Sequence, residues 1–62
     1  MNRKITIGVA EDQKIYRDGL VSMLNGTKSC SVVIEASNGL EILAKMKGNV
    51  PDVVLLDYRM PE

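Results

Sequence analysis

Several residue types that build common functional sites are scarce or missing from this chain. Its 62 residues contain no histidine, no tryptophan, no phenylalanine and a single cysteine, Cys30. A zinc cluster of cysteine and histidine is therefore excluded, and no disulfide can form within the chain. A lone thiol fits a reducing compartment, and we interpret Cys30 as a structural or idle residue rather than a redox sensor.

Net charge and long apolar runs are also absent. Eight basic and eight acidic side chains cancel, so net charge does not draw the chain to nucleic acid or to a membrane surface. The first apolar stretch, "ITIGVA" at residues 5–10, is too short for a signal peptide or for a membrane span of about 20 residues. We therefore predict a cytoplasmic protein with no membrane partner.

What is present is the composition of an ordinary globular domain. Apolar residues make up 45% of the chain and charged residues 26%, which separates it from disordered sequences. A domain of this length buries only about 60% of its unfolded surface, so a core of its own is marginal. Support from a partner or from further sequence is expected.

Three segments have the pattern of strands. Residues 4–10 alternate β-branched side chains with small ones, and residues 30–36 alternate similarly, with Glu35 exposed as at the edge of a sheet. The third segment, "VVLL" at residues 53–56, is continuously apolar. Such a run predicts a strand that is buried on both faces.

Two segments have the pattern of helices. Residues 14–25 place an apolar stripe at helical spacing. Residues 38–49 begin with a helix cap, since Asn38 stands three positions before Glu41, and Gly48 is placed to end the helix. The side chains expected on the buried faces are Tyr16, Leu20, Met23 and Leu24 in the first helix, and Leu40, Leu43 and Met46 or Lys47 in the second.

The order strand, helix, strand, helix, strand with short turns is typical of an α/β fold with a parallel sheet and right-handed crossovers. In such sheets, ligands bind at the carboxyl ends of the strands. Those ends are therefore where we look for chemistry.

Acidic side chains follow two of the predicted strands. Glu11 and Asp12 come directly after the first strand, and Asp57 comes directly after the third. If these strands are neighbours, about 4.8 Å apart, three carboxylates converge and repel one another. Oxygen ligands of this kind suit Mg²⁺. Taken singly, each acid is also compatible with a helix cap or a solvated loop residue.

These segments resemble the receiver domains of bacterial response regulators. "VAEDQ" at residues 9–13 is similar to the acidic pair of that family, and "VVLLDYRMP" at residues 53–61 is similar to its phosphoacceptor strand. "YRDGL" at residues 16–20 and "EASNGLEIL" at residues 35–43 resemble, in particular, LuxR/NarL-type regulators that carry a helix-turn-helix DNA-binding domain.

The resemblance implies a signalling role for the acidic residues rather than an enzyme of independent activity. Asp57 would take a phosphoryl group from a sensor histidine kinase, a phosphotransfer protein or a small phosphodonor. Asp12 would bind Mg²⁺ directly, Glu11 would act largely through water, and Arg59 would lend its backbone carbonyl. Lys14 and Arg59 flank the site, although solvated side chains are the more common case for such residues.

The resemblance also implies how much of a domain is at hand. Residues 1–62 would form the amino-terminal half of a receiver of flavodoxin-like fold, with strand order 2-1-3, because the family's later strands, its Ser or Thr and its Lys have no counterpart here. The rest of the receiver and any DNA-binding output domain would be absent. DNA would then be contacted only through that absent domain.

Two other functions are weighed against this one. A half receiver could act only as an interaction module, because strand order 2-1-3 leaves residues 53–56 at an unpaired edge, through which a dimer or higher assembly is expected. Haloacid-dehalogenase-type phosphatases also use an aspartate at the end of a strand. The chain resembles them only in "LLD", since Arg59 stands where that family has a second aspartate.

Overall fold

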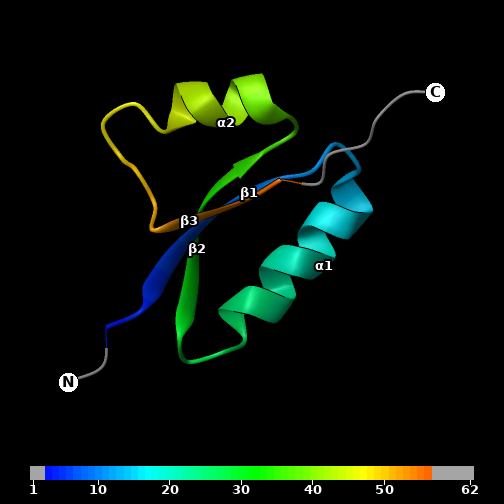
Figure 1. Cartoon of the computed structure of the whole chain (residues 1–62). Helices are drawn as coiled ribbons and strands as arrows, with labels where there is room; N and C mark the ends of the chain where they lie inside the picture. Colours follow the sequence, from blue (N-terminus) through cyan, green and yellow to red (C-terminus); the bar gives the residue numbers. More distant parts are fainter. Residues whose placement is uncertain (1–2, 57–62) are drawn as a thin grey trace.

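A computed structural model of the chain describes residues 3–56. Its described residues form three strands and two helices in the predicted order (Figure 1), and their bounds follow the sequence pattern except that the second helix is shorter than predicted. The elements are β1 (Ile5–Ala10), α1 (Lys14–Asn25), β2 (Cys30–Ala36), α2 (Gly39–Lys45) and β3 (Val53–Leu56).

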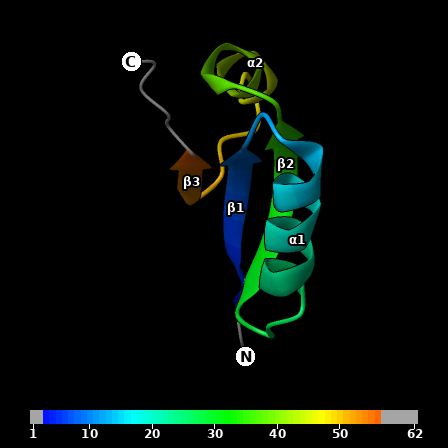
Figure 2. The ribbon, with the colours of Figure 1, turned by 90° about the vertical axis from the view of Figure 1, so that its right-hand side faces the viewer.

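The three strands form one parallel sheet in the order β2-β1-β3. They run side by side in the same direction, with β1 in the middle (Figure 2). Both the α/β class and the strand order 2-1-3 are thus confirmed. The prediction that Glu35 marks an edge strand is confirmed as well, because among the described strands β2 pairs with β1 alone and Glu35 is exposed.

The central strand is the most buried element, and small residues let α2 approach it. Gly8 and Ala10 lie on the face toward α2, where Ile42 packs against Ala10 and the buried residues of β2. A Cβ atom at Gly8 would lie 3.2 Å from Ile42 Cδ1 and 3.3 Å from Pro51 Cγ. The absence of a side chain at residue 8 therefore sets how closely α2 and the loop before β3 pack on the sheet.

The helices lie on opposite sides of the sheet (Figure 1), and the face that α1 turns inward differs from the predicted one. Tyr16 and Met23 are 56% and 64% exposed, so the prediction that they are buried is wrong for these two of the four side chains in the stripe. The more buried positions recur at the helical spacing i, i+3, i+4 and i+7, a stripe rotated by one residue. They are Arg17, Leu20, Val21 and Leu24.

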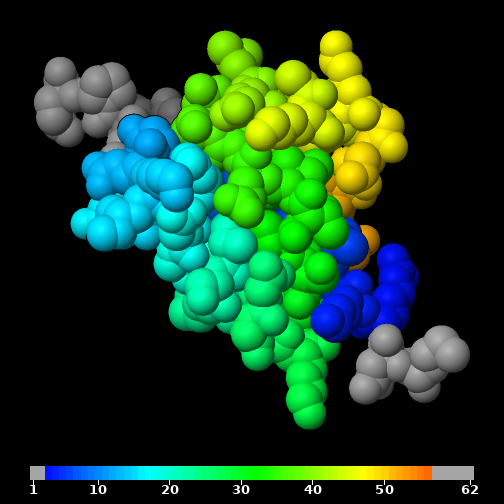
Figure 3. Space-filling model, turned by 180° about the vertical axis from the view of Figure 1, so that it is seen from behind, coloured from blue at the N-terminus to red at the C-terminus, as the bar shows by residue number. Residues whose placement is uncertain are grey.

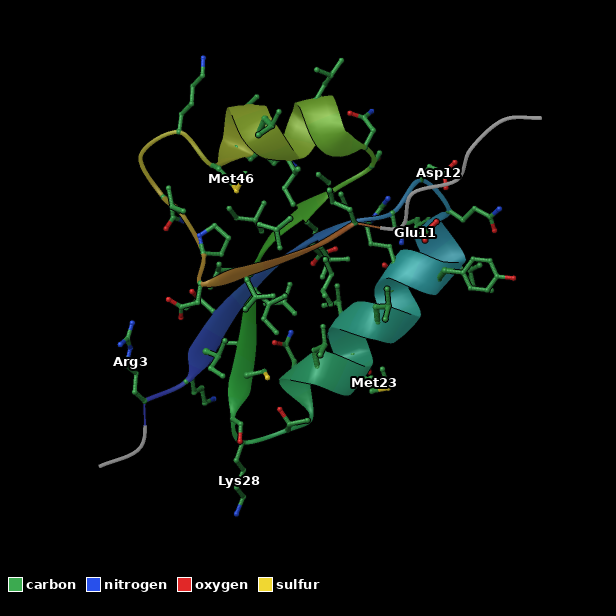
Figure 4. All side chains as sticks on the ribbon, in the orientation of Figure 1. Arg3, Glu11, Asp12, Met23, Lys28 and Met46 are labelled. Atoms are coloured by element: carbon green, nitrogen blue, oxygen red, sulfur yellow. The ribbon has the colours of Figure 1, made fainter. Side chains whose placement is uncertain are left out.

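The buried face of α2 also corrects the prediction in part. Ile42 is 1% exposed and Met46 packs partly against the core, whereas Leu40 and Leu43 are 82% and 59% exposed. Figure 4 shows Met46 pointing from α2 toward the sheet and Met23 on the outer side of α1. This seven-residue helix buries one side chain fully, that of Ile42, and both of its leucines are exposed to solvent.

The start of α2 follows the prediction, whereas its end comes earlier than predicted, because the helix ends at Lys45 and Met46 is its C-cap. Asn38 Oδ1 accepts a hydrogen bond of 2.8 Å from the Glu41 backbone N–H, and a Glu41 carboxylate oxygen accepts one from the Ser37 N–H. The Ser37 bond, assisted by Lys45 nearby, lowers the pKa of the Glu41 carboxyl. After the helix, Gly48 has a φ of +82°, a backbone conformation that glycine adopts without steric cost.

β3 is not buried on both faces, contrary to the prediction from its continuous apolar sequence. Val53, Leu55 and Leu56 are 43%, 38% and 58% exposed. The reason is topological, because within residues 3–56 β3 pairs only with β1 and both helices pack on β1 and β2. Seen from behind, β2 lies at the surface between α2 and α1 (Figure 3).

Candidate functional site

The register of the sheet brings the carboxyl ends of all three strands together. Ala10 at the end of β1 pairs with Ala36 at the end of β2 and with Leu56 at the end of β3. The acidic pair leaves the sheet immediately after Ala10. This edge is the one that the sequence predicted to carry the chemistry.

A polar clasp at the opposite end of β3 holds this register. The Thr6 backbone N–H and hydroxyl donate to Asp52 Oδ2 at 2.9 and 3.1 Å, and the Asp52 N–H donates back to Thr6 Oγ1 at 2.9 Å. The Thr6 N–H in particular, with the hydroxyl and then Arg3, lowers the pKa of the Asp52 carboxyl. Because the clasp lies one residue before the pair Ile7 and Val53, it fixes which residue of β3 ends beside Ala10.

Glu11 is buried at the exit of β1, with only 2% of its surface exposed. Its backbone N–H donates to the Ala36 carbonyl at 3.0 Å, and its Oε2 accepts from the Gln13 N–H at 2.8 Å. A carboxylate out of water requires such bonds. The Gln13 N–H precedes the first turn of α1, so Glu11 serves partly as an acceptor for the start of that helix.

Asp12 is exposed beside it, and Figure 4 shows both acids where β1 passes into α1. Asp57 and Arg59 lie outside the described residues, so their predicted roles remain predictions. Within residues 3–56, no group of three or more histidine, cysteine, aspartate and glutamate side chains could hold a metal ion. Of the four predicted metal ligands, Glu11 and Asp12 are therefore the two that the structure describes.

Arg17 contacts the acidic pair and is not among the residues predicted from the sequence. Its Nη1 donates to the Glu11 carbonyl at 2.8 Å and to Ser37 Oγ at 3.4 Å, and its Nε lies 4.0 Å from a Glu35 carboxylate oxygen. The signal was present in "YRDGL". Its partner is a backbone carbonyl, however, which no residue pattern reveals.

Lys14 does not turn toward the acidic pair. Its ammonium pairs with Asp18 Oδ2 at 2.6 Å, one helical turn away, and its side chain is 76% exposed. This is the solvated arrangement considered the more common case. Cys30 is a free, half-buried thiol at the start of β2.

A polar hollow of about 230 Å³ lies beside the end of β2. Its two cations are each paired with an acid, Arg17 with Glu35 and Lys45 with Glu41 at 3.5 Å. The charges therefore balance within the hollow. The residues lining it are Arg17, Glu35, Ala36, Ser37, Glu41 and Lys45.

Within residues 3–56, neither helix is long and apolar enough to cross a lipid bilayer.

Comparison with protein families gives a match to the response regulator receiver domain over residues 7–62. A search of the solved structures gave no match.

The chain is similar to several curated bacterial proteins. It is 43% identical over 58 residues to a probable transcriptional regulatory protein NarL of Mycobacterium tuberculosis, which covers 94% of the chain and 27% of that protein. It is 44% identical over 57 residues to the transcriptional regulatory protein LnrK of Bacillus subtilis, covering 92% and 26%.

A protein-glutamate methylesterase/protein-glutamine glutaminase of Pseudomonas savastanoi pv. phaseolicola is 35% identical over 60 residues, covering 97% of the chain and 17% of that protein. Segments similar to this chain thus occur both in proteins named as transcriptional regulators and in one named as an enzyme. The chain spans about a quarter of the length of the two transcriptional regulators.

Proposed function

The chain belongs to the response regulator receiver domain family, and from that premise we propose that Asp57 accepts a phosphoryl group in two-component signalling. The observation that carries the proposal is the register of the sheet. Ala10 pairs with Leu56, so β1 and β3 end at the same level, and Glu11 and Asp57 are the next residues in the sequence after these two ends. A parallel α/β sheet binds its ligands at this edge.

The residues at this edge fit a magnesium ion by the chemistry of their donor atoms. Glu11 and Asp12 offer carboxylate oxygens, and Asp57 and the backbone carbonyl of Arg59 would complete an all-oxygen set, which is the set that Mg²⁺ prefers. Asp12, which is exposed, would bind directly, and the buried Glu11 would act largely through water. When bound, Mg²⁺ neutralises negative charge on the phosphoryl group during transfer.

The chemical step assigned to the chain is a nucleophilic displacement. A carboxylate oxygen of Asp57 bonds to phosphorus while the bond between phosphorus and the donor's leaving group breaks, which yields an acyl phosphate. The donor is the phosphohistidine of a sensor kinase or phosphotransfer protein, or a small molecule such as acetyl phosphate. The chain supplies the acceptor oxygen and the carboxylates that bind the cation.

In this proposal, residues 1–62 are the amino-terminal half of a receiver. The parent protein controls an output, and transcription is the proposed output because two of the relatives are named transcriptional regulatory proteins. Contact with DNA would belong to another domain. A cytoplasmic location agrees with the proposal and remains a prediction.

The proposal is tested by incubating the purified chain with Mg²⁺ and acetyl phosphate and then measuring its intact mass. We expect a single phosphoryl adduct that Asp57→Asn abolishes and that chelation of Mg²⁺ prevents. Asp18→Asn is the matched control, because Asp18 is an exposed acid on α1 paired with Lys14. An adduct that persists in Asp57→Asn, or no adduct in a chain shown to be folded, would contradict the proposal.

A second function, self-association through β3, is favoured by a separate observation. β3 presents an edge that no strand of residues 3–56 pairs, and Val53, Leu55 and Leu56 are exposed beside it. Unpaired backbone groups next to apolar side chains are a template for another strand. The occupant we propose is β3 of a second copy of this chain.

For this interface we expect a dimer or larger assembly in size-exclusion chromatography with light scattering. Leu55→Lys should shift the chain toward monomer, because it places a charge on the proposed contact. Ile15→Lys should not, because Ile15 is equally apolar and 77% exposed but lies on α1. A monomeric, cooperatively folding chain at micromolar concentration would rule out the assembly.

A further inference from the structure

The guanidinium of Arg17 is withdrawn from water, unlike the other cation at the start of α1. Its side chain is 16% exposed, against 76% for Lys14 one turn earlier. Burying most of a permanently charged group is unfavourable unless hydrogen bonds replace its hydration. The groups that Arg17 contacts therefore indicate its role in the structure.

Those partners belong to the ends of two strands. Arg17 Nη1 donates to the Glu11 carbonyl at 2.8 Å and, more weakly, to Ser37 Oγ at 3.4 Å. Its Nε lies 4.0 Å from Glu35. One side chain of α1 thus joins the residue after β1 to the end of β2, at the edge where the strand ends meet.

The short bond acts on the peptide unit that carries the acidic pair. A peptide unit is planar, so the carbonyl of Glu11 and the N–H of Asp12 turn together. Holding that carbonyl fixes the direction in which the chain enters Asp12. The Glu11 N–H is held by the Ala36 carbonyl and Oε2 of its carboxylate by the Gln13 N–H, and Arg17 adds a bond to the Glu11 carbonyl.

We propose that Arg17 is a positioning residue for the acidic pair, which it orients for a divalent cation by holding the Glu11 carbonyl. The inference rests on the proposed function, because the cation is the one that phosphoryl transfer requires. Outer partners that orient metal ligands typically change metal affinity by about 10- to 100-fold when they are removed. Arg17 would act less directly than such a partner, because it holds the backbone carbonyl of Glu11 and not a carboxylate that binds the cation.

The sign of the effect separates positioning from simple electrostatics. Arg17 is a positive charge near a proposed cation site, so repulsion alone predicts that its removal strengthens binding of the cation. Positioning predicts the opposite, a weaker site. Lys14→Gln measures the charge effect alone, because Lys14 lies three residues before Arg17 in α1 but bonds only to Asp18 among the contacts described.

The experiment measures Mn²⁺ binding to the full chain by the electron paramagnetic resonance signal of the free ion, with folding checked by circular dichroism. We expect Arg17→Gln to weaken binding about tenfold and Arg17→Lys, which keeps the charge, to weaken it less. Lys14→Gln should leave the affinity equal or slightly higher. Unchanged or tighter binding in folded Arg17→Gln overturns the proposal, and if that variant does not fold, Arg17→Lys decides in the same way.

A second readout needs no metal. Amide hydrogen exchange at Gln13, whose N–H bonds to Glu11, should become faster in the Arg17 variants relative to exchange at Ile42, which lies in α2. Equal exchange at Gln13 in all chains overturns the positioning role. If the unsubstituted chain binds no Mn²⁺, the proposed function fails, and the exchange result alone then decides the role of Arg17.

Discussion

Replacing Ile42 by alanine should remove most of the stability of this fold. Ile42 is 1% exposed and is the single buried side chain of α2. Truncating a buried isoleucine to alanine costs about 2–5 kcal/mol. A domain of this size has only about 3–9 kcal/mol in total, so the variant should be largely unfolded or have a greatly lowered midpoint in urea.

The control for this loss is Leu40→Ala in the same helix. Leu40 is 82% exposed, so its truncation should change the free energy of unfolding by no more than about 0.5 kcal/mol. Both variants are measured by circular dichroism in urea at one protein concentration, because association would also stabilise the fold. Equal losses in the free energy of unfolding from the two variants would contradict the described packing, in which Ile42 faces the sheet and Leu40 faces solvent.

A side chain at residue 8 should also destabilise the sheet strongly. In Gly8→Val, Cβ alone would lie 3.2 Å from Ile42 Cδ1 and 3.3 Å from Pro51 Cγ, and the two methyl groups extend further. Forcing extra carbon into a packed interior costs about 1–3 kcal/mol. The displaced parts are α2 and the loop that leads into β3, so the register of β3 should loosen as well.

Gly19→Ala is the matched glycine control. Apart from its chain neighbours and the backbone of α1 itself, no atom of residues 3–56 lies within 4 Å of a Cβ at residue 19, which is exposed within α1. Alanine there should stabilise the helix by about 0.5–1 kcal/mol. The two glycine variants should therefore move the urea midpoint in opposite directions, and a loss of stability in both would contradict the described packing.

Local patterns predicted the elements of this fold well. The strand bounds, the bounds of α1 and the Asn38 cap each depend on a few consecutive residues, whereas the end of α2 was predicted too late, at Gly48 instead of Lys45. The family resemblance also holds, because residues 7–62 match the receiver domain.

The errors concern features that depend on distant neighbours. "VVLL" has the composition of a central strand, but its burial requires a second neighbouring strand, which residues 3–56 do not contain. The inward faces of the helices were misjudged because several apolar stripes fit the same sequence. In α2 the sheet selects Ile42 over Leu40 and Leu43.

The site was predicted in part. The sequence placed Glu11 and Asp12 at the end of β1, where the structure has them, and the roles of these two acids, of Asp57 and of Arg59 all remain proposals. Arg17 was missed because its main partner is a backbone carbonyl. The clasp between Thr6 and Asp52 joins residues 46 positions apart in the sequence, so no local pattern indicates it.

The central claim is that the ends of β1 and β3 form one cation-dependent site. It is tested most directly by titrating the ¹⁵N-labelled chain with Mg²⁺ and following every backbone amide by nuclear magnetic resonance. We predict saturable shifts with one common dissociation constant at Glu11, Asp12 and the amides following Leu56, all lost in Asp12→Asn. Shifts confined to one strand end, or scattered over surface acids such as Asp18 without saturation, would contradict the claim.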